Sequence, residues 1–288
     1  MKKVGSKFIF SFIYMLSVFS VSSAQSFFTI IDDDAQSREA VSSVNKVADR
    51  RGVKISYAVV AQKLQQDKMM VELLLEYQRQ GHHICNHSLT HSSIWKTPHE
   101  DDIKFELEQS ERILDSLGFK NHNFLVYPFG KFSKSTYTWL IPLVSQKFKM
   151  AFESRGYGND LKKTNRYTIN RLPLRKHDSR LIVRSLINET IDHHGWIVFY
   201  THSGNSRDYS DEMLEETIAY CQERGMKCLT VKEAEELGLL DNVCVKEWTS
   251  IDEFIYVLYM HIEWVVLILL IIGAVISCWI WLKIKCYG

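Results

Sequence analysis

The 288-residue sequence has few of the features that mark linkers, repeats or nucleic-acid binding. Its four prolines and thirteen glycines are scattered, and no low-complexity tract interrupts the chain. No period of about twenty to fifty residues repeats. The formal net charge is +1, with no basic run in the body of the chain. These absences argue against a repeat array, against domains joined by a linker and against a nucleic-acid partner.

Cysteine is also sparse, and the spacing of the six cysteines does not resemble that of a zinc cluster. Cys221 and Cys228 flank an expected turn from helix to strand, where they could pair in an oxidising compartment. Spacing alone leaves a disulfide and two free buried thiols equally open.

Long apolar runs are confined to the two ends of the chain. At the N-terminus, three lysines are followed by an apolar run from Phe8 to Val21 and by a small-residue pattern that ends at Ala24. This order is typical of a secretory signal peptide, which we expect over residues 1–24. An uncleaved membrane anchor is the alternative.

The C-terminal run from Val265 to Leu282 contains no charged residue, has tryptophans near its edges and is followed by two lysines. This pattern predicts a transmembrane helix over residues 264–283 with a positive cytoplasmic flank, and a buried core helix is the alternative. Residues 243–263 are expected to form an amphipathic juxtamembrane linker. The chain between the two apolar segments would then lie outside the cytoplasm, anchored to the membrane.

Residues 25–242 are sufficient for one large α/β domain. Apolar runs alternate there with amphipathic helical patterns. Strands are expected at residues 27–31, 53–60, 83–85, 123–130, 149–152, 168–172, 196–200 and 227–231, and helices at 38–51, 67–80, 100–117, 179–191, 211–224 and 231–237. This alternation predicts a parallel sheet, most economically a barrel, with its chemistry at the carboxyl ends of the strands.

Histidines with metal-ligand spacing occur in the segment Gly81–His91. His87 and His91 are four residues apart, and we expect them on one face of a helical turn, where two imidazoles can converge on one ion. Two histidines are only half of a metal site. The nearest acidic candidates are Asp32–Asp34, directly after the apolar run Phe27–Ile31.

Other polar residues also follow expected strands. They include Tyr127–Gly130 and the pair Thr201 and His202. Because the carboxyl ends of parallel strands meet at one rim, these residues are expected to lie near the aspartates and histidines.

The segment Gly81-His82-His83-Ile84-Cys85-Asn86-His87-Ser88-Leu89-Thr90-His91 is similar to the metal motif G-H-E-I-x-N-H-[ST]-x-[ST]-H. That motif belongs to the polysaccharide deacetylases of the NodB-homology type, carbohydrate esterase family four. The order of motifs resembles this family over roughly Phe27 to Leu237. The resemblance implies a distorted parallel (β/α) barrel of the NodB type, and it places His83, in the position of the acid, next to the site.

The family's first motif is a strand ending in T-F-D-D-G, whose first aspartate is the general base and whose second is a metal ligand. Counting back from Gly52 aligns Ala35 with the motif glycine. The resemblance then implies Asp33 as the base and Asp34 as the ligand, with Asp32 as the fallback of a register one residue earlier. Alanine in place of glycine implies a backbone that avoids the left-handed region.

The third family motif, R-x-P-[FY]-G, is matched by Tyr127–Gly130 without its arginine. The resemblance implies that the Phe129 N–H holds the oxyanion. Arg171 is the candidate to replace the arginine that orients the base, and a surface or structural arginine is the alternative. The fifth motif, L-x-H, resembles Val198–His202, which makes His202 the expected general acid. The fourth motif is not located.

The resemblance implies a metal-dependent hydrolase. One divalent ion, with zinc as first choice, would be held by Asp34, His87 and His91. Asp33 would take a proton from the attacking water, and His202 would protonate the departing amine or alcohol. The expected substrate is an N-acetylated or O-acetylated polysaccharide of the cell envelope or outside the cell. The alternative is a membrane-tethered, carbohydrate-binding pseudoenzyme of the same fold.

Specificity is expected in rim loops at residues 132–138 and 203–209. There Tyr137, Trp139 and Tyr209 could stack on sugar rings or simply pack.

Overall fold

The computed structural model describes residues 25–241, 270–273 and 275–277. The chain divides into two compact units, residues 1–132 with 136–245 and residues 133–135 with 246–288. The sheet and all the candidate site residues belong to the first unit. The expected signal peptide and juxtamembrane linker lie outside the described residues.

The expected transmembrane helix falls largely outside the described residues as well, with helical structure described at 270–273 and 275–277. Within the part of the chain that the structure describes, no helix is both long enough and apolar enough to cross a membrane.

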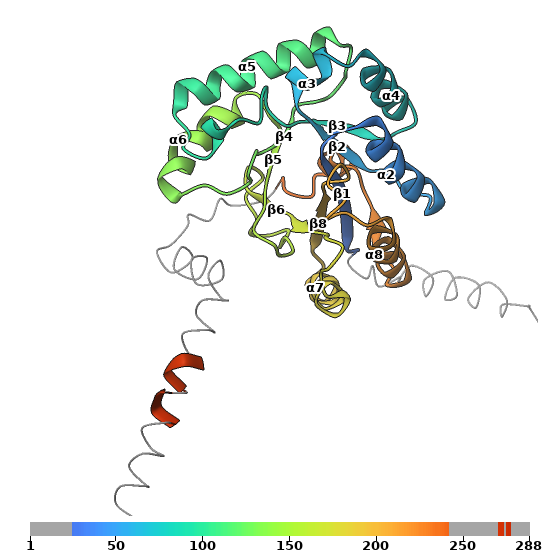
Figure 1. The fold of residues 1–288 in the computed structure, drawn as a ribbon, viewed down its shortest axis with the longest axis vertical. Helices are drawn as coiled ribbons and strands as arrows, with labels where there is room; N and C mark the ends of the chain where they lie inside the picture. The colour runs from blue at the N-terminus through green and yellow to red at the C-terminus, as the bar shows by residue number, and fades with distance from the viewer. Residues whose placement is uncertain (1–24, 242–269, 274, 278–288) are drawn as a thin grey trace, which may run out of the picture. The chain divides into compact units, whose positions relative to one another are not determined.

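Parallel strands form the centre of the first unit (Figure 1). The sheet order is β6-β5-β4-β3-β2-β1-β8-β7, and β9 pairs with β1. The strands are β1 (Phe27–Asp34), β2 (Ser56–Val59), β3 (His83–Asn86), β4 (Phe124–Val126), β5 (Met150–Glu153), β6 (Ile169–Asn170), β7 (Leu172–Pro173), β8 (Trp196–Thr201) and β9 (Lys227–Cys228).

One short segment joins the two ends of this sheet. β6 pairs with β5, and β7 pairs with β8, although only Arg171 separates β6 from β7. The segment 169–173 therefore bridges both edges, and the sheet curls into a nearly closed barrel. The predicted parallel (β/α) barrel is confirmed.

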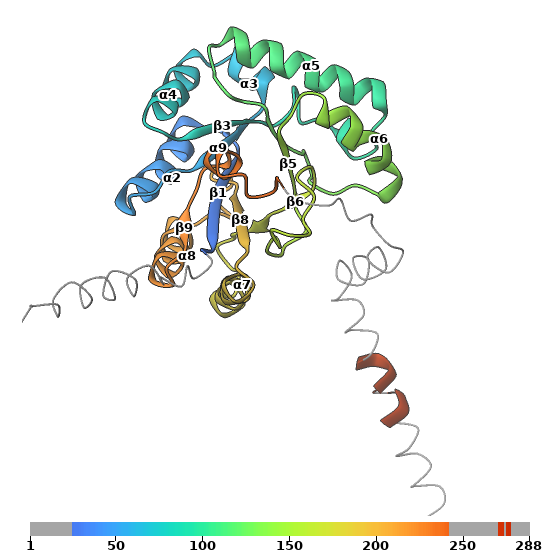
Figure 2. The same cartoon turned by 180° about the vertical axis from the view of Figure 1, so that it is seen from behind.

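Most helices surround the strands, as Figures 1 and 2 show from opposite sides. The helices are α2 (Arg38–Arg50), α3 (Ala61–Gln65), α4 (Lys68–Arg79), a 3-10 helix (Ser93–Trp95), α5 (Glu100–Ser116), α6 (Lys134–Ser145), α7 (Arg180–Asp192), α8 (Asp211–Glu223) and α9 (Val231–Glu236). Their order between the strands follows the expected alternation.

The core has an inner and an outer part because side chains of a strand alternate between its two faces. In β8, Trp196 and Val198 belong to the cluster that also contains the buried residues of α9, whereas Ile197 and Phe199 pack with the apolar faces of α2, α4, α7 and α8. Both faces of the strands are therefore buried, which explains their nearly continuous apolar sequences.

The rim segment 132–138 is not the loop that the sequence predicts. Helix α6 begins at Lys134, Tyr137 is buried, and its hydroxyl donates a hydrogen bond to Glu153. Trp139 and Tyr209 are partly buried and pack against apolar clusters. Tyr137 is therefore a packing residue, because the barrel exterior offers its ring more contact than the open rim does.

Three cysteines lie among the described residues, and all three carry free thiols: Cys85, Cys221 and Cys228. The possible disulfide between Cys221 and Cys228 is thus not present. The other cysteines of the sequence lie outside the described residues.

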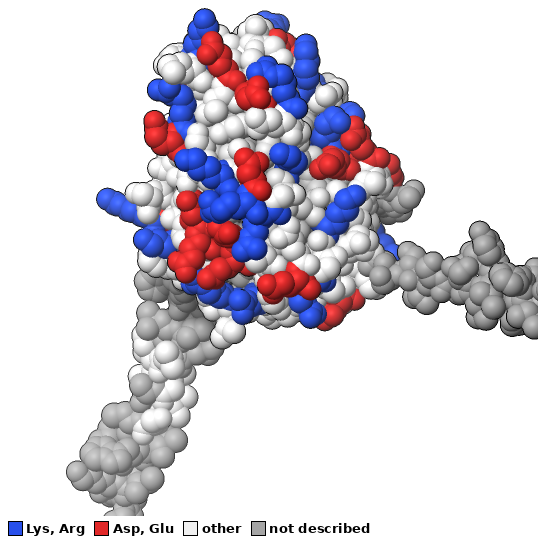
Figure 3. All heavy atoms as spheres, turned by 90° about the vertical axis from the view of Figure 1, so that its right-hand side faces the viewer, with Lys and Arg blue, Asp and Glu red and all other residues white. Residues whose placement is uncertain are grey.

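Charges of both signs are interspersed on the face shown in Figure 3, which corresponds to the right-hand side of Figure 1. Some opposite charges form ion pairs between helices: Arg50 of α2 and the next residue, Arg51, both pair with Glu215 of α8. This face offers no continuous basic surface of the kind that binds a phosphate backbone.

Candidate metal and catalytic site

The sheet brings several chemically active side chains to one rim. Asp34 ends β1, His87 follows β3, Phe129 lies just beyond β4, and His202 follows β8. The register aligns the strand ends, since Asp34 pairs with Val59. The expected meeting of these residues at the carboxyl ends of the strands is observed.

Asp34, His87 and His91 form a compact group. The Nε2 atoms of both histidines lie 3.9 Å from Asp34 Oδ1, and the three possible ligand atoms lie within 4.8 Å of one another. These are two imidazoles and one carboxylate, a donor set that suits a zinc ion. A slight contraction would bring all three atoms to a shared cation.

The surroundings of His87 favour its role as a ligand. Its Nδ1–H donates to the Val126 carbonyl at 2.7 Å, which leaves the Nε2 lone pair facing the group. Nε2 is buried and has no hydrogen-bond partner within the described structure. Burial lowers the pKa of His87 to about 4, so the ring is neutral at neutral pH. An unpartnered buried nitrogen of this kind fits a bound metal.

His87 and His91 converge without a helix, which corrects the predicted helical turn. The residues between them form a bent loop, with positive φ angles of 70° at Ser88 and 53° at His91. Asn86 Oδ1 accepts from the Ser88 N–H at 2.8 Å, and Ser88 Oγ accepts from the His91 N–H at 3.1 Å. These side-chain hydrogen bonds hold the tight loop in place of helical backbone bonds.

Glu106 of α5 supports the same loop. Its carboxylate accepts from the Thr90 N–H at 3.0 Å, the Thr90 hydroxyl at 2.6 Å and the Trp95 indole N–H at 3.3 Å. Our sequence reasoning missed this residue. The available signal was an acidic residue on the buried helix stripe between Ile103 and Ser110.

Asp33 is held by Arg171 on the other side of the rim. Nη1 of Arg171 lies 2.7 and 2.8 Å from the two Asp33 oxygens, and the side chains are only 2% and 3% exposed. The Arg171 Nε–H donates to the Glu153 carbonyl at 3.3 Å, and the guanidinium lies 4.6 Å from the centre of the Tyr200 ring. An arginine from the closing segment thus contacts Asp33, the residue that the resemblance implies as the base.

His202 lies beside the same carboxylate. Its Nε2 is 3.9 Å from Asp33 Oδ2, too long for a hydrogen bond, and its side chain is 38% exposed. The imidazole can therefore meet a substrate from the solvent side while Asp33 lies deeper.

Phe129 borders the histidines. Its ring lies 4.8 Å from that of His91 and is 41% exposed, and its backbone has a positive φ of 60°. Its N–H donates to no acceptor in the described part of the chain. At the next residue, Gly130, a Cβ would lie 2.9 Å from Ser154 Oγ, so this turn requires glycine.

The three consecutive aspartates have different environments. Asp34 faces the histidines and Asp33 faces Arg171, whereas Asp32 is buried against Thr201 and Ser203. Burial raises the pKa of Asp32 to about 6, although its hydrogen bonds act in the opposite direction. The geometry favours the register with Asp33 and Asp34 over the fallback at Asp32.

Ala35 adopts the left-handed conformation that its Cβ was expected to exclude. Its φ is 42°, directly after Asp34 at 72°. Of the seven non-glycine residues with positive φ among those described, five lie at this rim: Asp34, Ala35, Ser88, His91 and Phe129. Such strain is concentrated where the surrounding structure fixes a functional arrangement.

His83 does not lie next to the site, contrary to expectation. It begins β3, at the opposite end from His87, and packs edge-on against Phe124 with a ring distance of 5.0 Å. Burial lowers its pKa to about 3. A residue at the start of a strand cannot reach the rim at its end.

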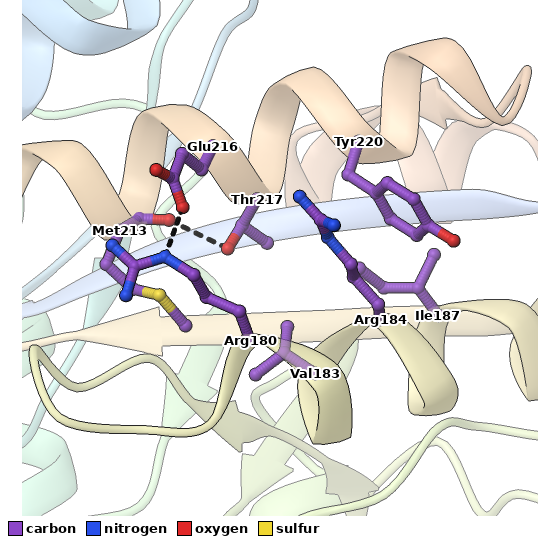
Figure 4. Close-up of a pocket in the computed structure, with 8 residues that line it drawn as sticks. All are labelled: Arg180, Val183, Arg184, Ile187, Met213, Glu216, Thr217 and Tyr220. Carbon is purple, nitrogen blue, oxygen red and sulfur yellow. Dashed lines mark hydrogen bonds and ion pairs between the residues drawn. The ribbon is translucent and has the colours of Figure 1, made fainter.

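A separate shallow groove runs between α7 and α8 (Figure 4). Arg180 pairs there with Glu216, and Arg184 lies 4.9 Å from the Tyr220 ring. No cluster of metal ligands lines it. Its lining residues are Arg180, Val183, Arg184, Ile187, Met213, Glu216, Thr217 and Tyr220.

Comparisons with solved structures find the same fold. A putative polysaccharide deacetylase from Mycobacterium smegmatis has a TM-score of 0.60 at 13% identity, covering 78% of this chain and 94% of that one. A CE4 family pseudoenzyme from Bacillus anthracis has a TM-score of 0.54 at 16% identity, covering 77% and 67%. A family 4 acetyl xylan esterase from Clostridium thermocellum, in complex with a cobalt ion, has a TM-score of 0.51 at 16% identity, covering 74% and 91%. No curated protein matches the chain.

The catalytic and metal-binding roles of the rim residues stay predictions, while their placement agrees with the motifs that suggested them. The family model described as Polysaccharide deacetylase matches residues 23–141, a span that contains the aspartates, the histidine loop and the Phe129 turn. The chain is therefore similar to this family over residues 23–141, and it shares the barrel fold of solved structures that are described as polysaccharide deacetylases.

Proposed function

We propose that the barrel is a metal-dependent deacetylase that hydrolyses N-acetyl or O-acetyl groups of a cell-envelope or extracellular polysaccharide. The observation that carries this proposal is the convergence of Asp34, His87 and His91 beside a carboxylate, Asp33, that Arg171 holds in place. The match of residues 23–141 to the polysaccharide deacetylase model supports it, as does the name of the neighbouring acetyl xylan esterase.

The proposed ligands of one divalent ion, most simply zinc, are Asp34, His87 and His91. When bound, such an ion supplies a Lewis acid that polarises a carbonyl and lowers the pKa of water. The neutral state of His87 and its hydrogen bond to Val126 suit this task, because a metal ligand must present an unprotonated nitrogen in a fixed orientation.

The protein residues divide the proton transfers between them. Asp33 accepts the proton from the attacking water, and Arg171 keeps its carboxylate oriented. The Phe129 N–H donates a hydrogen bond to the oxygen that develops negative charge on the acetyl carbon. His202, at the exposed side of Asp33, donates the proton that the departing amine or alcohol requires.

We also propose that the enzyme is exported and anchored to the membrane, with the barrel on the extracytoplasmic side. The support is sequence alone: the signal-like segment at residues 1–24 and the uncharged run at 264–283. Recovery of the full chain in the membrane fraction, with its barrel cleaved by protease added to intact cells, is the expected result. Recovery in the cytosolic fraction would overturn this location.

The activity is tested by acetate release from an acetylated aminosugar polymer and from acetyl xylan, with zinc added to metal-depleted protein. Release should depend on metal and fall by at least about 100-fold in Asp33→Asn and His87→Ala. His193→Ala, which changes an exposed histidine at the end of α7, is the matched control and should keep full activity.

The two substrates separate amide from ester hydrolysis. Polymer binding that survives Asp33→Asn and His87→Ala, with no acetate released by the wild type from either substrate, would replace the hydrolase with the carbohydrate-binding alternative.

A further inference from the structure

Asp32 is a fully buried carboxylate that the proposed reaction does not use. Its Oδ1 accepts from the Thr201 hydroxyl at 2.7 Å and from the Ser203 N–H at 3.0 Å, and its Oδ2 accepts from the Ser203 hydroxyl at 2.7 Å. All three donors thus come from the two residues that flank His202. No donor comes from the histidines of the rim.

The position of His202 depends on these flanking residues. Thr201 is the last residue of β8, where it pairs with Asp32, and beyond it the regular ladder of β8 ends. Among the described residues, the His202 imidazole makes no hydrogen bond, since Asp33 Oδ2 lies 3.9 Å from its Nε2. Its ring lies edge-on to the Tyr200 ring, with centroids 5.5 Å apart. Its direction therefore depends on the backbone on either side and on this one ring contact.

Asp32 fixes this backbone at both sides. The bond to the Ser203 N–H continues the contact between β1 and β8 to the second residue past the end of β8, through a side chain instead of a carbonyl. Gly204 then packs against Gln36, whose amide donates to Asp34 at 3.2 Å. The segment that carries His202 is thus held against the segment that carries the proposed metal ligand.

We propose that Asp32 is a positioning residue for His202, which orients the general acid by holding its two neighbours. This inference rests on the proposed function, in which His202 protonates the leaving group. It adds a role for the one aspartate of the three that touches neither the ligand group nor Arg171.

Substrates with different leaving groups distinguish a positioning role of Asp32 from a purely structural one. A sugar amine or alkoxide needs a proton to depart, whereas 4-nitrophenolate departs without one. Loss of a well-oriented general acid should slow hydrolysis of the acetylated aminosugar polymer and spare hydrolysis of 4-nitrophenyl acetate. Damage to the metal group or to Asp33 should slow both.

We would compare Asp32→Ala with Asp32→Asn, which keeps an oxygen for Thr201 and the Ser203 N–H. Asp32→Ala should lower kcat on the polymer by about 10- to 100-fold with little change in KM, and on the aryl ester by less than about 3-fold. Asp32→Asn should retain most of both activities. His202→Ala should show the same selectivity as Asp32→Ala, and the double variant should be no worse than the more damaged single variant.

Hydrogen exchange at the Ser203 amide gives a readout that needs no turnover. Exchange should accelerate in Asp32→Ala and stay slow in Asp32→Asn. Equal losses on both substrates, or unchanged exchange in Asp32→Ala, would overturn the inference. If Asp32→Ala does not fold, Ser203→Ala must show the same selective loss, about 3- to 10-fold, for the inference to stand.

Wild-type protein that hydrolyses neither substrate would refute the proposed function by a separate result. The exchange measurement would still decide whether Asp32 holds the segment around His202.

Discussion

Asp33 and Arg171 meet across 138 residues of chain in a nearly solvent-free ion pair. A buried carboxylate without its partner is strongly destabilising, by about 3–5 kcal/mol in comparable pairs. The same contact fixes the direction of the Asp33 carboxylate at the rim. At this residue, therefore, stability and the proposed chemistry depend on one interaction.

Arg171→Met should therefore impair both properties. We expect the free energy of unfolding to fall by about 3 kcal/mol. We also expect kcat/KM to fall by at least about 10-fold, because Asp33 loses the contact that orients its carboxylate. Urea unfolding and acetate-release kinetics measure the two effects. Arg171→Lys is the control and should restore part of each; an unchanged kcat/KM in Arg171→Met would show that Arg171 does not act on Asp33.

His83 makes the barrel sensitive to acid. Its folded-state pKa of about 3 lies below the usual value of 6.5, so between these pH values the unfolded chain binds a proton that the folded chain does not. Stability therefore falls as pH falls through this window, by about 1.4 kcal/mol per pH unit for one such group.

His83→Phe removes this group and keeps a ring against Phe124. Between pH 7 and pH 5 the wild type should lose about 2 kcal/mol more unfolding free energy than the variant, measured by urea unfolding with chelator present. Equal losses would mean that other groups dominate the acid response, for instance His82, whose pKa burial also lowers, to about 4.

The individual site residues were largely predictable, whereas their environments were not. The family resemblance suggested His87, His91, and Asp33 with Asp34, with Asp32 as the fallback, and it left Arg171 as a candidate beside a structural arginine. The structure brings Asp33, Asp34, both histidines and Arg171 to one rim, while their roles stay predictions. Three adjacent aspartates could not be assigned from sequence alone, because each environment depends on which strand or loop lies beside it.

Among the elements, the loop after β3 depends on the helix that follows it. Glu106 of α5 accepts three hydrogen bonds from Thr90 and Trp95, and so fixes the loop between His87 and the 3-10 helix. In metal sites, groups that orient the ligands typically change affinity by about 10- to 100-fold when removed.

Glu106→Ala should lower zinc affinity by about 10- to 100-fold and leave buried donors unpaired, which destabilises the fold by about 1–3 kcal/mol. Glu106→Gln, which can still accept a hydrogen bond, should keep affinity within several-fold. Lys104→Ala, an exposed change on the same helix, is the control. Calorimetric titration of metal-free protein measures the zinc affinity. An affinity in Glu106→Ala equal to that of the wild type would show that α5 does not influence metal binding.

Element prediction succeeded where one face is clearly apolar. Helices α2, α4 and α5 occur within a residue or so of their expected ranges. Helix α6 was missed because Pro142 and many aromatic and β-branched residues hide its periodicity, and packing on the barrel overrides these weak local preferences. The prediction of a helical turn between His87 and His91 was wrong for the opposite reason. The spacing of the histidines suits a helix, but the side chains of Asn86, Ser88 and Glu106 accept hydrogen bonds from the backbone of this loop.

The whole barrel closes through the segment 169–173, whose two halves pair with β5 and β8. Closure and site assembly are coupled there, since Arg171 lies between the halves and binds Asp33 of β1. Residues 25–241 thus contain every described contact of the candidate site.

A protein that ends at Asn242 should accordingly be soluble and should keep the proposed metal-dependent activity. Zinc affinity, acetate release and sedimentation measure this. Insolubility of the shortened protein, with rescue by adding back residues 243–263, would show that the domain extends past this boundary.

The sequence by itself determined the alternation of strands and helices, the barrel class and the set of polar residues at the strand ends, because periodicity and motif order are local properties of the chain. Only the tertiary structure decided which aspartate faces the histidines, that Ala35 is strained, that Arg171 reaches the base and that His83 lies at the far end. These facts depend on strand register and barrel closure, which join residues more than a hundred positions apart and leave no local trace in the sequence.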